Sequence, residues 1–174
     1  DESQEVKFDV DGVQVTNATL KLTDEMGNRR FKFDNMNLTT GHIAKNEPIT
    51  LDASLHAVGD NPKMDANIQL KGSLLADAEK KIFGAKGLDA AIQGSVDSLS
   101  KLDLKVSGDL EAKPELSEFM VDSLKLVVKA DMQGKVLALA LTAPKITAQK
   151  DEISGKEVNV ELSCALSTRD LTRS

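Results

Sequence analysis

The chain has 174 residues and a formal net charge of −6, and 40% of its residues are hydrophobic. One domain, or one slice of a longer repetitive protein, fits this length. The acidic balance argues against nucleic acid as a partner, because phosphates require a basic surface. Cys164 is the only cysteine, which excludes an internal disulfide.

The apolar residues are mostly Leu, Val, Ile and Ala, with five Phe and neither Trp nor Tyr. An aliphatic set of this kind either packs as an ordinary core or lines a surface that contacts acyl chains. No apolar run approaches the roughly 18 residues that a membrane-spanning helix needs, and residues 1–5 do not form a signal peptide. Because the chain starts without Met or an export signal, we expect an excised fragment or a mature product.

Apolar and polar residues alternate through the first third of the chain, which is the pattern of strands with one buried face. The predicted strands span residues 6–10, 13–22, 29–38 and 49–55. Turns are predicted at Asp11-Gly12 and over 24–28, and a loop over 41–48. The apolar phase slips by one residue at Asp34-Asn35, which predicts a β-bulge.

The segment 65–93 occurs twice, with a period of 36 residues. The clearest matches set Gly72, Leu74, Ala76, Phe83 and Leu88 against Gly108, Leu110, Ala112, Phe119 and Leu124. A fainter third copy contains Ile146 and Ala148. Such self-similarity indicates stacked units that bury their apolar faces against their neighbours. Each unit is a strand, a polar crossover and a second strand, and we expect short helical turns at the crossovers over 77–81 and 114–120.

The remainder of the chain continues this pattern. Further strands are predicted over residues 102–110, 124–130, 137–141 and 153–164. Pro144 interrupts the alternation, and residues 168–174 form a polar tail after a single domain over 1–167. The count predicts an all-β, antiparallel, repetitive sheet of about ten strands with one or two short helical turns. Alternation fits both a closed sandwich and a groove whose apolar side stays partly open.

The sequence provides no catalytic residues and predicts neither a metal site nor a cofactor. His42 and His56 have no spaced ligands beside them and are interpreted as solvated. Asp9 and Asp11 lack the downstream acidic ligand of a calcium loop, so we interpret them as turn-capping residues. Cys164 lies on the apolar phase of its strand and is expected to be a small buried hydrophobe rather than a nucleophile.

The sharpest functional hypothesis concerns the apolar side of the sheet as a whole. It would bind acyl chains if it remained open, and it would be an ordinary dry core if the sheet closed into a sandwich. The predicted lining residues are Leu51, Leu55, Ile68, Leu70, Leu88, Ile92, Leu104, Val106, Leu124, Leu126, Leu139 and Leu141.

Several segments resemble the AsmA family in order and spacing. The entry Val10-Asp11-Gly12-Val13-Gln14-Val15 is similar to the family's "I-x-D-G-x-(V/L)-x-(V/L)-x-D", and 33–38 is similar to its strand end "L-x-(D/N)-(L/M)-x-L". Further similar segments are 18–24, 47–55, 68–74 and 88–92, so the resemblance runs from about Phe8 to Cys164.

The resemblance implies a non-enzymatic periplasmic protein of Gram-negative bacteria that acts in outer-membrane biogenesis. AsmA-like proteins are anchored in the inner membrane by an N-terminal helix, and their β-rich groove is thought to conduct phospholipids. The implied partners are phospholipid or another acyl-chain ligand, and other envelope proteins. Membrane contact would come from regions outside this chain, upstream of Asp1. The alternative is a structural or adhesive β-repeat spacer, or a protein-docking domain, with a closed core.

Overall fold

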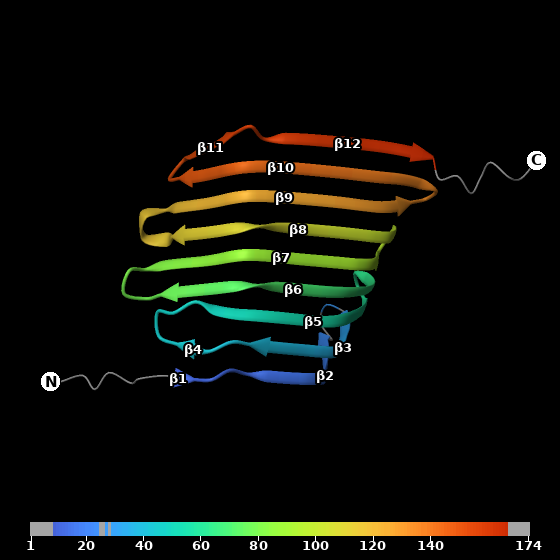
Figure 1. Cartoon of the computed structure of the whole chain (residues 1–174). Helices are drawn as coiled ribbons and strands as arrows, with labels where there is room; N and C mark the ends of the chain where they lie inside the picture. The colour runs from blue at the N-terminus through green and yellow to red at the C-terminus, as the bar shows by residue number, and fades with distance from the viewer. Residues whose placement is uncertain (1–8, 25–26, 28, 167–174) are drawn as a thin grey trace, which may run out of the picture.

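The protein forms one antiparallel β-sheet of ten strands, seen in a computed structural model that describes residues 9–24, 27 and 29–166. This confirms the predicted all-β, antiparallel, repetitive fold (Figure 1). The expected strand start at 6–8 and the polar tail lie outside the described residues. So does most of the predicted turn over 24–28.

The strands follow one another along the chain and across the sheet, with hairpin connections. They are β1 (Asp9–Val10), β2 (Gln14–Asp24), β3 (Arg29–Thr40), β4 (Ile43–Ala44), β5 (Ile49–Asp60), β6 (Lys63–Asp77), β7 (Ile82–Val96), β8 (Leu99–Lys113), β9 (Glu118–Met132), β10 (Lys135–Gln149), β11 (Glu152–Lys156) and β12 (Asn159–Leu166). The order is β2-β3-β5-β6-β7-β8-β9-β10, after which β11 and β12 each pair with part of β10. The short strands β1 and β4 pair with each other.

The 36-residue repeat of the sequence is also a repeat of the backbone. Strands β6, β8 and β10 are each 15 residues long and begin at Lys63, Leu99 and Lys135. Strand β7 carries one extra residue relative to both of its neighbours, at the left-handed Gly87 (φ 57°), and β9 carries one relative to β8, at the left-handed Ser123 (φ 54°). A bulge of this kind bends its strand and increases the local twist. Strand β8 carries a further extra residue near its start, at the left-handed Lys101 (φ 50°), so the feature shared by the two repeats is a 15-residue strand followed by a strand bulged at the same position.

Three sequence-based expectations need correction. Only the second crossover forms a helical turn, the 3-10 helix η1 (Pro114–Leu116), because Pro at the first helical position presets the backbone. The first crossover is a plain turn, closed by the Asp77 carboxylate, which accepts a hydrogen bond from the Lys80 N–H at 2.9 Å. The loop over 41–48 contains the two-residue strand β4.

The third correction concerns the last strand, which is broken rather than continuous. It divides into β11 and β12 at Glu157, whose φ is 56°. The predicted bulge at Asp34-Asn35 is confirmed, because the register between β3 and β5 shifts between Asp34 and Asn37, and Asn35 has φ 50°.

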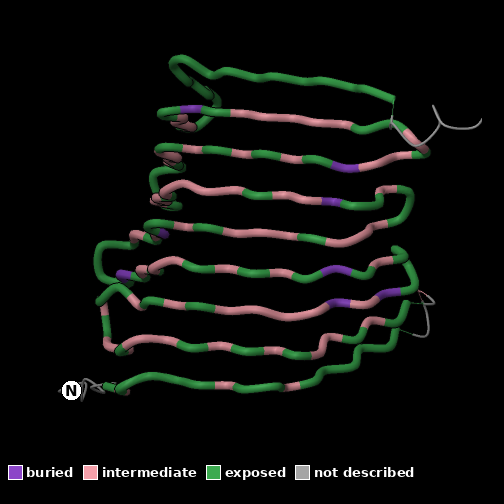
Figure 2. Tube along the Cα trace, turned by 45° about the vertical axis from the view of Figure 1, so that its right-hand side comes forward, coloured by how far each residue is buried: buried purple, intermediate pink, exposed green. Residues whose placement is uncertain are grey.

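The sheet is a single layer with very little dry core (Figure 2). Among the described residues, the buried apolar side chains are Ala57, Ala66, Ala85, Leu102, Ala130 and Ala143, and no large side chain is fully buried. All substantial contacts between strands join hydrogen-bonded neighbours. The closed sandwich does not form, because tight hairpins keep each strand beside its sequence neighbour, with no long connection to carry the chain into a second layer.

Candidate functional site

All twelve predicted lining residues lie on one side of the sheet, which we call the apolar face. Residues directly opposite each other in an antiparallel pair project from the same face, so the pairing register shows which side chains meet. Two lines of aliphatic residues cross the strands along this face. They are named after Leu55 and Leu70.

The Leu55 row crosses seven strands without a polar interruption. It contains Leu55, Ile68, Ile92, Leu104, Val128, Leu139 and Leu162, each directly opposite the next. Five of these are among the twelve predicted residues. The sequence analysis did not single out Val128 or Leu162, although both share the alternating phase of their strands.

The Leu70 row is longer and reaches both edges of the sheet. It contains Val15, Leu38, Ala53, Leu70, Ala90, Val106, Leu126, Leu141 and Val160. Its nine strands span eight steps of about 4.8 Å, which makes the row roughly 38 Å long. The last three predicted residues flank this row, with Leu51 opposite Gly72, Leu88 opposite Gly108 and Leu124 opposite Ala143.

No second layer covers the apolar face among the described residues. All twelve side chains are half-buried, shielded by their neighbours within the sheet and by nothing above it. Towards the ends of the strands, larger apolar side chains are more open, including Phe83 and Phe119, each 47% exposed. A continuous aliphatic surface of this extent is typical of sites that bind another protein, a membrane or an apolar ligand.

The opposite face of the sheet carries charged and polar side chains, some of which interact across strands. Lys71 Nζ lies 3.1 Å from Asp52 Oδ2, and Gln93 donates a hydrogen bond to Asp103 at 3.4 Å. Lys81, in the turn between β6 and β7, forms an ion pair with Glu115 of η1. Charged and polar side chains of this kind are typical of a face in contact with water. The two faces of the sheet therefore differ, one suited to water and the other to apolar surroundings.

His56, predicted to be merely solvated, is the centre of the most organised polar cluster on that face. Its Nε2 lies 2.8 Å from Asp65 Oδ1, and its Nδ1 lies 2.8 Å from Asp34 Oδ1. These hydrogen bonds, first to Asp65 and then to Asp34, raise the pKa of His56 above its ordinary value. Lys32, 2.6 Å from the other Asp34 oxygen, is the main cause of the lowered pKa of Asp34, with His56 second.

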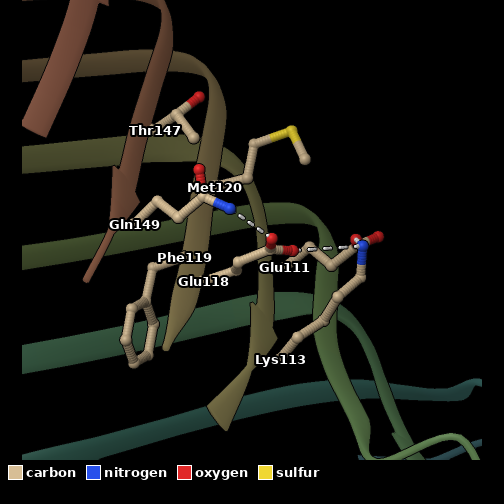
Figure 3. A pocket seen from close by; sticks show the side chains of 7 residues that line it. All are labelled: Glu111, Lys113, Glu118, Phe119, Met120, Thr147 and Gln149. Atoms are coloured by element: carbon tan, nitrogen blue, oxygen red, sulfur yellow. Dashed lines mark hydrogen bonds and ion pairs between the residues drawn. The ribbon is translucent and has the colours of Figure 1, made fainter. Parts of the chain in front are cut away.

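A small hollow lies where β8 and β10 end and β9 begins, lined by Glu111, Lys113, Glu118, Phe119, Met120, Thr147 and Gln149 (Figure 3). Its polar groups satisfy one another, since Gln149 donates to Glu118 at 2.6 Å and Lys113 lies 3.2 Å from Glu111. Its volume of about 140 Å³ is below that of ordinary ligand pockets. The hollow is small, and its carboxylates are already engaged by Gln149 and Lys113. Neither property favours a catalytic site.

Among the described residues, the other candidates form no organised cluster, although His42 and Asp9 contact each other. His42 approaches Asp9 at 3.4 Å, and both side chains are largely exposed. Within the part of the chain that the structure describes, no group of His, Cys, Asp and Glu has the arrangement of a metal site. Cys164 is exposed, so its predicted burial is wrong: it keeps the apolar phase opposite Leu137, but β12 is an edge strand that no other described residue covers.

Neither a protein-family model nor a curated protein nor a solved structure matches this chain. Its only helical element over residues 9–24, 27 and 29–166 is the three-residue η1, and no helix there has the length and apolarity needed to cross a bilayer.

Proposed function

We propose that this chain is a non-enzymatic domain that binds lipid acyl chains along the apolar face. The observation that carries the proposal is the alignment of the Leu55 and Leu70 rows across the sheet, without a covering layer among the described residues. The resemblance to the AsmA family supports the same function, with phospholipid as the ligand and the periplasm of a Gram-negative bacterium as the location. Transport between membranes in outer-membrane biogenesis would follow from that location.

The mechanism is partition and requires no chemical step. Each methylene that leaves water for the aliphatic rows contributes about 0.8 kcal/mol. Headgroups remain in solvent at the margins, because the face offers aliphatic carbon and few polar partners. Since the rows run across strands without a break, an acyl chain would meet similar side chains at every strand, which favours sliding over tight capture at one position.

The first test is native mass spectrometry, with lipid extraction, of the chain purified from a Gram-negative host. We expect co-purified phospholipid and binding of a fluorescent fatty-acid probe. Leu126→Asp is expected to weaken probe binding by at least about tenfold, because it places a carboxylate in the middle of the Leu70 row. Leu70→Asp is expected to act in the same way.

Val127→Asp is the matched control. Val127 is the next residue on the same strand, lies on the opposite face and is 41% exposed, so it introduces the same charge away from the rows. Circular dichroism and thermal unfolding confirm that each variant is folded. A lipid-free protein that ignores the probe, or equal effects of Leu126→Asp and Val127→Asp, would contradict lipid binding and favour a structural spacer.

A further inference from the structure

The two edges of the sheet differ in how well they are protected against pairing with another strand. An exposed edge carries unpaired N–H and C=O groups, which proteins usually guard with bulges, prolines or lysines. Strand β2, at one edge, is interrupted by register shifts around Ala18, by a left-handed Asn17 (φ 55°) and by Lys21. This edge cannot offer a long, regular template.

Strand β12, at the other edge, has none of these protections. Its eight residues pair with β10 in one continuous register, and it contains no proline, lysine, arginine or left-handed residue. Its only strand partner among the described residues is β10. Its apolar side chains are widely open to solvent, with Val160 58%, Leu162 75% and Leu166 78% exposed. Among the described residues, the Leu55 row and the Leu70 row therefore both end at β12, a regular edge strand without these protections.

We propose that β12 pairs with β12 of a second copy of this chain, antiparallel and about a two-fold axis, to form a dimer. A two-fold axis perpendicular to the sheet keeps both apolar faces on the same side, so the Leu55 and Leu70 rows continue into the second copy. The pairing is isologous and closes after two chains. The guarded β2 edges then lie at the outer ends and stop further growth.

Charge selects the register of this pairing. With Leu162 opposite Leu162 of the second copy, Val160 meets Cys164, Val158 meets Leu166, and Glu161 meets Ser163. A slip by one residue on each copy, which puts Glu161 opposite itself, sets two like charges against each other and is disfavoured. The preferred register thus joins apolar to apolar on one face and leaves each Glu161 beside a neutral hydroxyl on the other.

Sedimentation and light scattering over a range of concentrations test the dimer with the full 174-residue chain. We expect a monomer–dimer equilibrium whose dissociation constant rises at least about tenfold in Leu162→Lys, since each copy then carries a charge at the centre of the pairing. Leu20→Lys is the matched control, because Leu20 is also apolar, 45% exposed and on an edge strand. It should leave the equilibrium unchanged.

Cysteine cross-linking tests the register itself. In a Cys164→Ser background, Leu162→Cys places two thiols at the two-fold axis, where directly opposite Cα atoms are about 4.5–5.5 Å apart, within disulfide range. Mild oxidation should link this variant, and not the matching Leu20→Cys variant, into a covalent dimer. A chain that stays monomeric, a dimer that Leu162→Lys leaves intact, or open-ended assemblies that Leu20→Lys halts would each overturn the proposal. Bound lipid is not required for any of these readouts, so they are independent of the acyl-chain proposal.

Discussion

His56 Nδ1 lies 2.8 Å from Oδ1 of Asp34, although 22 residues separate them in the sequence. The contact exists because β3 and β5 pair with these two residues directly opposite each other, just before the bulge that starts at Asp34. Asp65, from β6, closes the other side of the imidazole at 2.8 Å. Only the imidazolium has N–H donors on both nitrogens, so two carboxylate partners favour the protonated ring.

This cluster makes stability depend on pH, with a sign that the pKa directions determine. The stabilisation that comes from the raised pKa of His56 is fully present below about pH 6.5 and is lost as pH rises through the higher pKa of the folded state. The stabilisation that comes from the lowered pKa of Asp34 is present above about pH 3.8 and is lost as pH falls through the lower pKa of the folded state. The cluster therefore contributes most between these two pH values.

We expect His56→Gln to lower the free energy of unfolding, with the largest deficit between about pH 4 and pH 6.5 and a smaller one at higher pH. Urea unfolding at a series of pH values measures this. His42→Gln is the control, because His42 and Asp9 are 3.4 Å apart and mostly in solvent, and a change below about 1 kcal/mol is expected there. A His56→Gln deficit that does not vary with pH would contradict the assigned role.

Gly94 is expected to tolerate no side chain. It is paired with Ala66 on β6 and Leu102 on β8, and a Cβ at this position would collide with the Asp65 carbonyl oxygen and lie 2.6 Å from Ala66 Cα. Gly94→Ala should cost about 3 kcal/mol in chemical denaturation, since the obstruction is backbone and cannot move aside.

Gly87→Ser should cost only about 1 kcal/mol. Gly87 has open space around it, and the equivalent residue of the next repeat is Ser123 in the same conformation. Equal losses would mean that the strands adjust.

Leu102 is expected to matter more for stability than any leucine of the edge strand β12. It is 8% exposed, whereas Leu162 is 75% exposed. Leu102→Ala should lower the free energy of unfolding by about 2–3 kcal/mol through lost burial and the cavity left behind. Leu162→Ala removes the same atoms from a site already in water. It should change the free energy of unfolding by less than about 0.5 kcal/mol in dilute, monomeric protein. Similar values would show that the small core does not stabilise the sheet.

Asp77 is expected to make the β6–β7 turn sensitive to acid. The Lys80 N–H donates to its carboxylate at 2.9 Å, and this hydrogen bond is the main cause of the lowered pKa of Asp77. Its contribution is present above about pH 3.8 and is lost as pH falls through the lower folded pKa. Asp77→Ala should speed hydrogen exchange of the amides at 78–81 at neutral pH, while the amides of the Gln133–Gly134 turn, which the Asp131 carboxylate closes, stay unchanged. Unchanged exchange at 78–81 would show that the turn forms without the carboxylate.

Much of the sheet follows from the sequence alone because the relevant signals are local. Alternation has the period of the strand, so most of β6 and residues 137–141 of β10 could be predicted as strand without knowledge of their partners. The continuation of β10 through Pro144 to Gln149 was not predicted, because a proline interrupts the alternation there. The 36-residue period likewise predicted that the strand, crossover and strand of β6 and β7 recur in β8 and β9, and the phase slip at Asp34 predicted a bulge. The twelve aliphatic residues share a face for the same reason.

Only the tertiary structure decided which strands pair and which side chains are covered. Alternation is identical for a sandwich and for a single layer, so the absence of a second layer over the described residues could not be predicted. The exposure of Cys164 depends on β12 being an edge, and the carboxylates around His56 come from β3 and β6 through a register that includes a bulge. The sequence by itself determined where strands, turns and apolar side chains lie along the chain, since each residue's conformation depends mainly on near neighbours. Partner identity and burial are non-local, and they were decided when the strands paired.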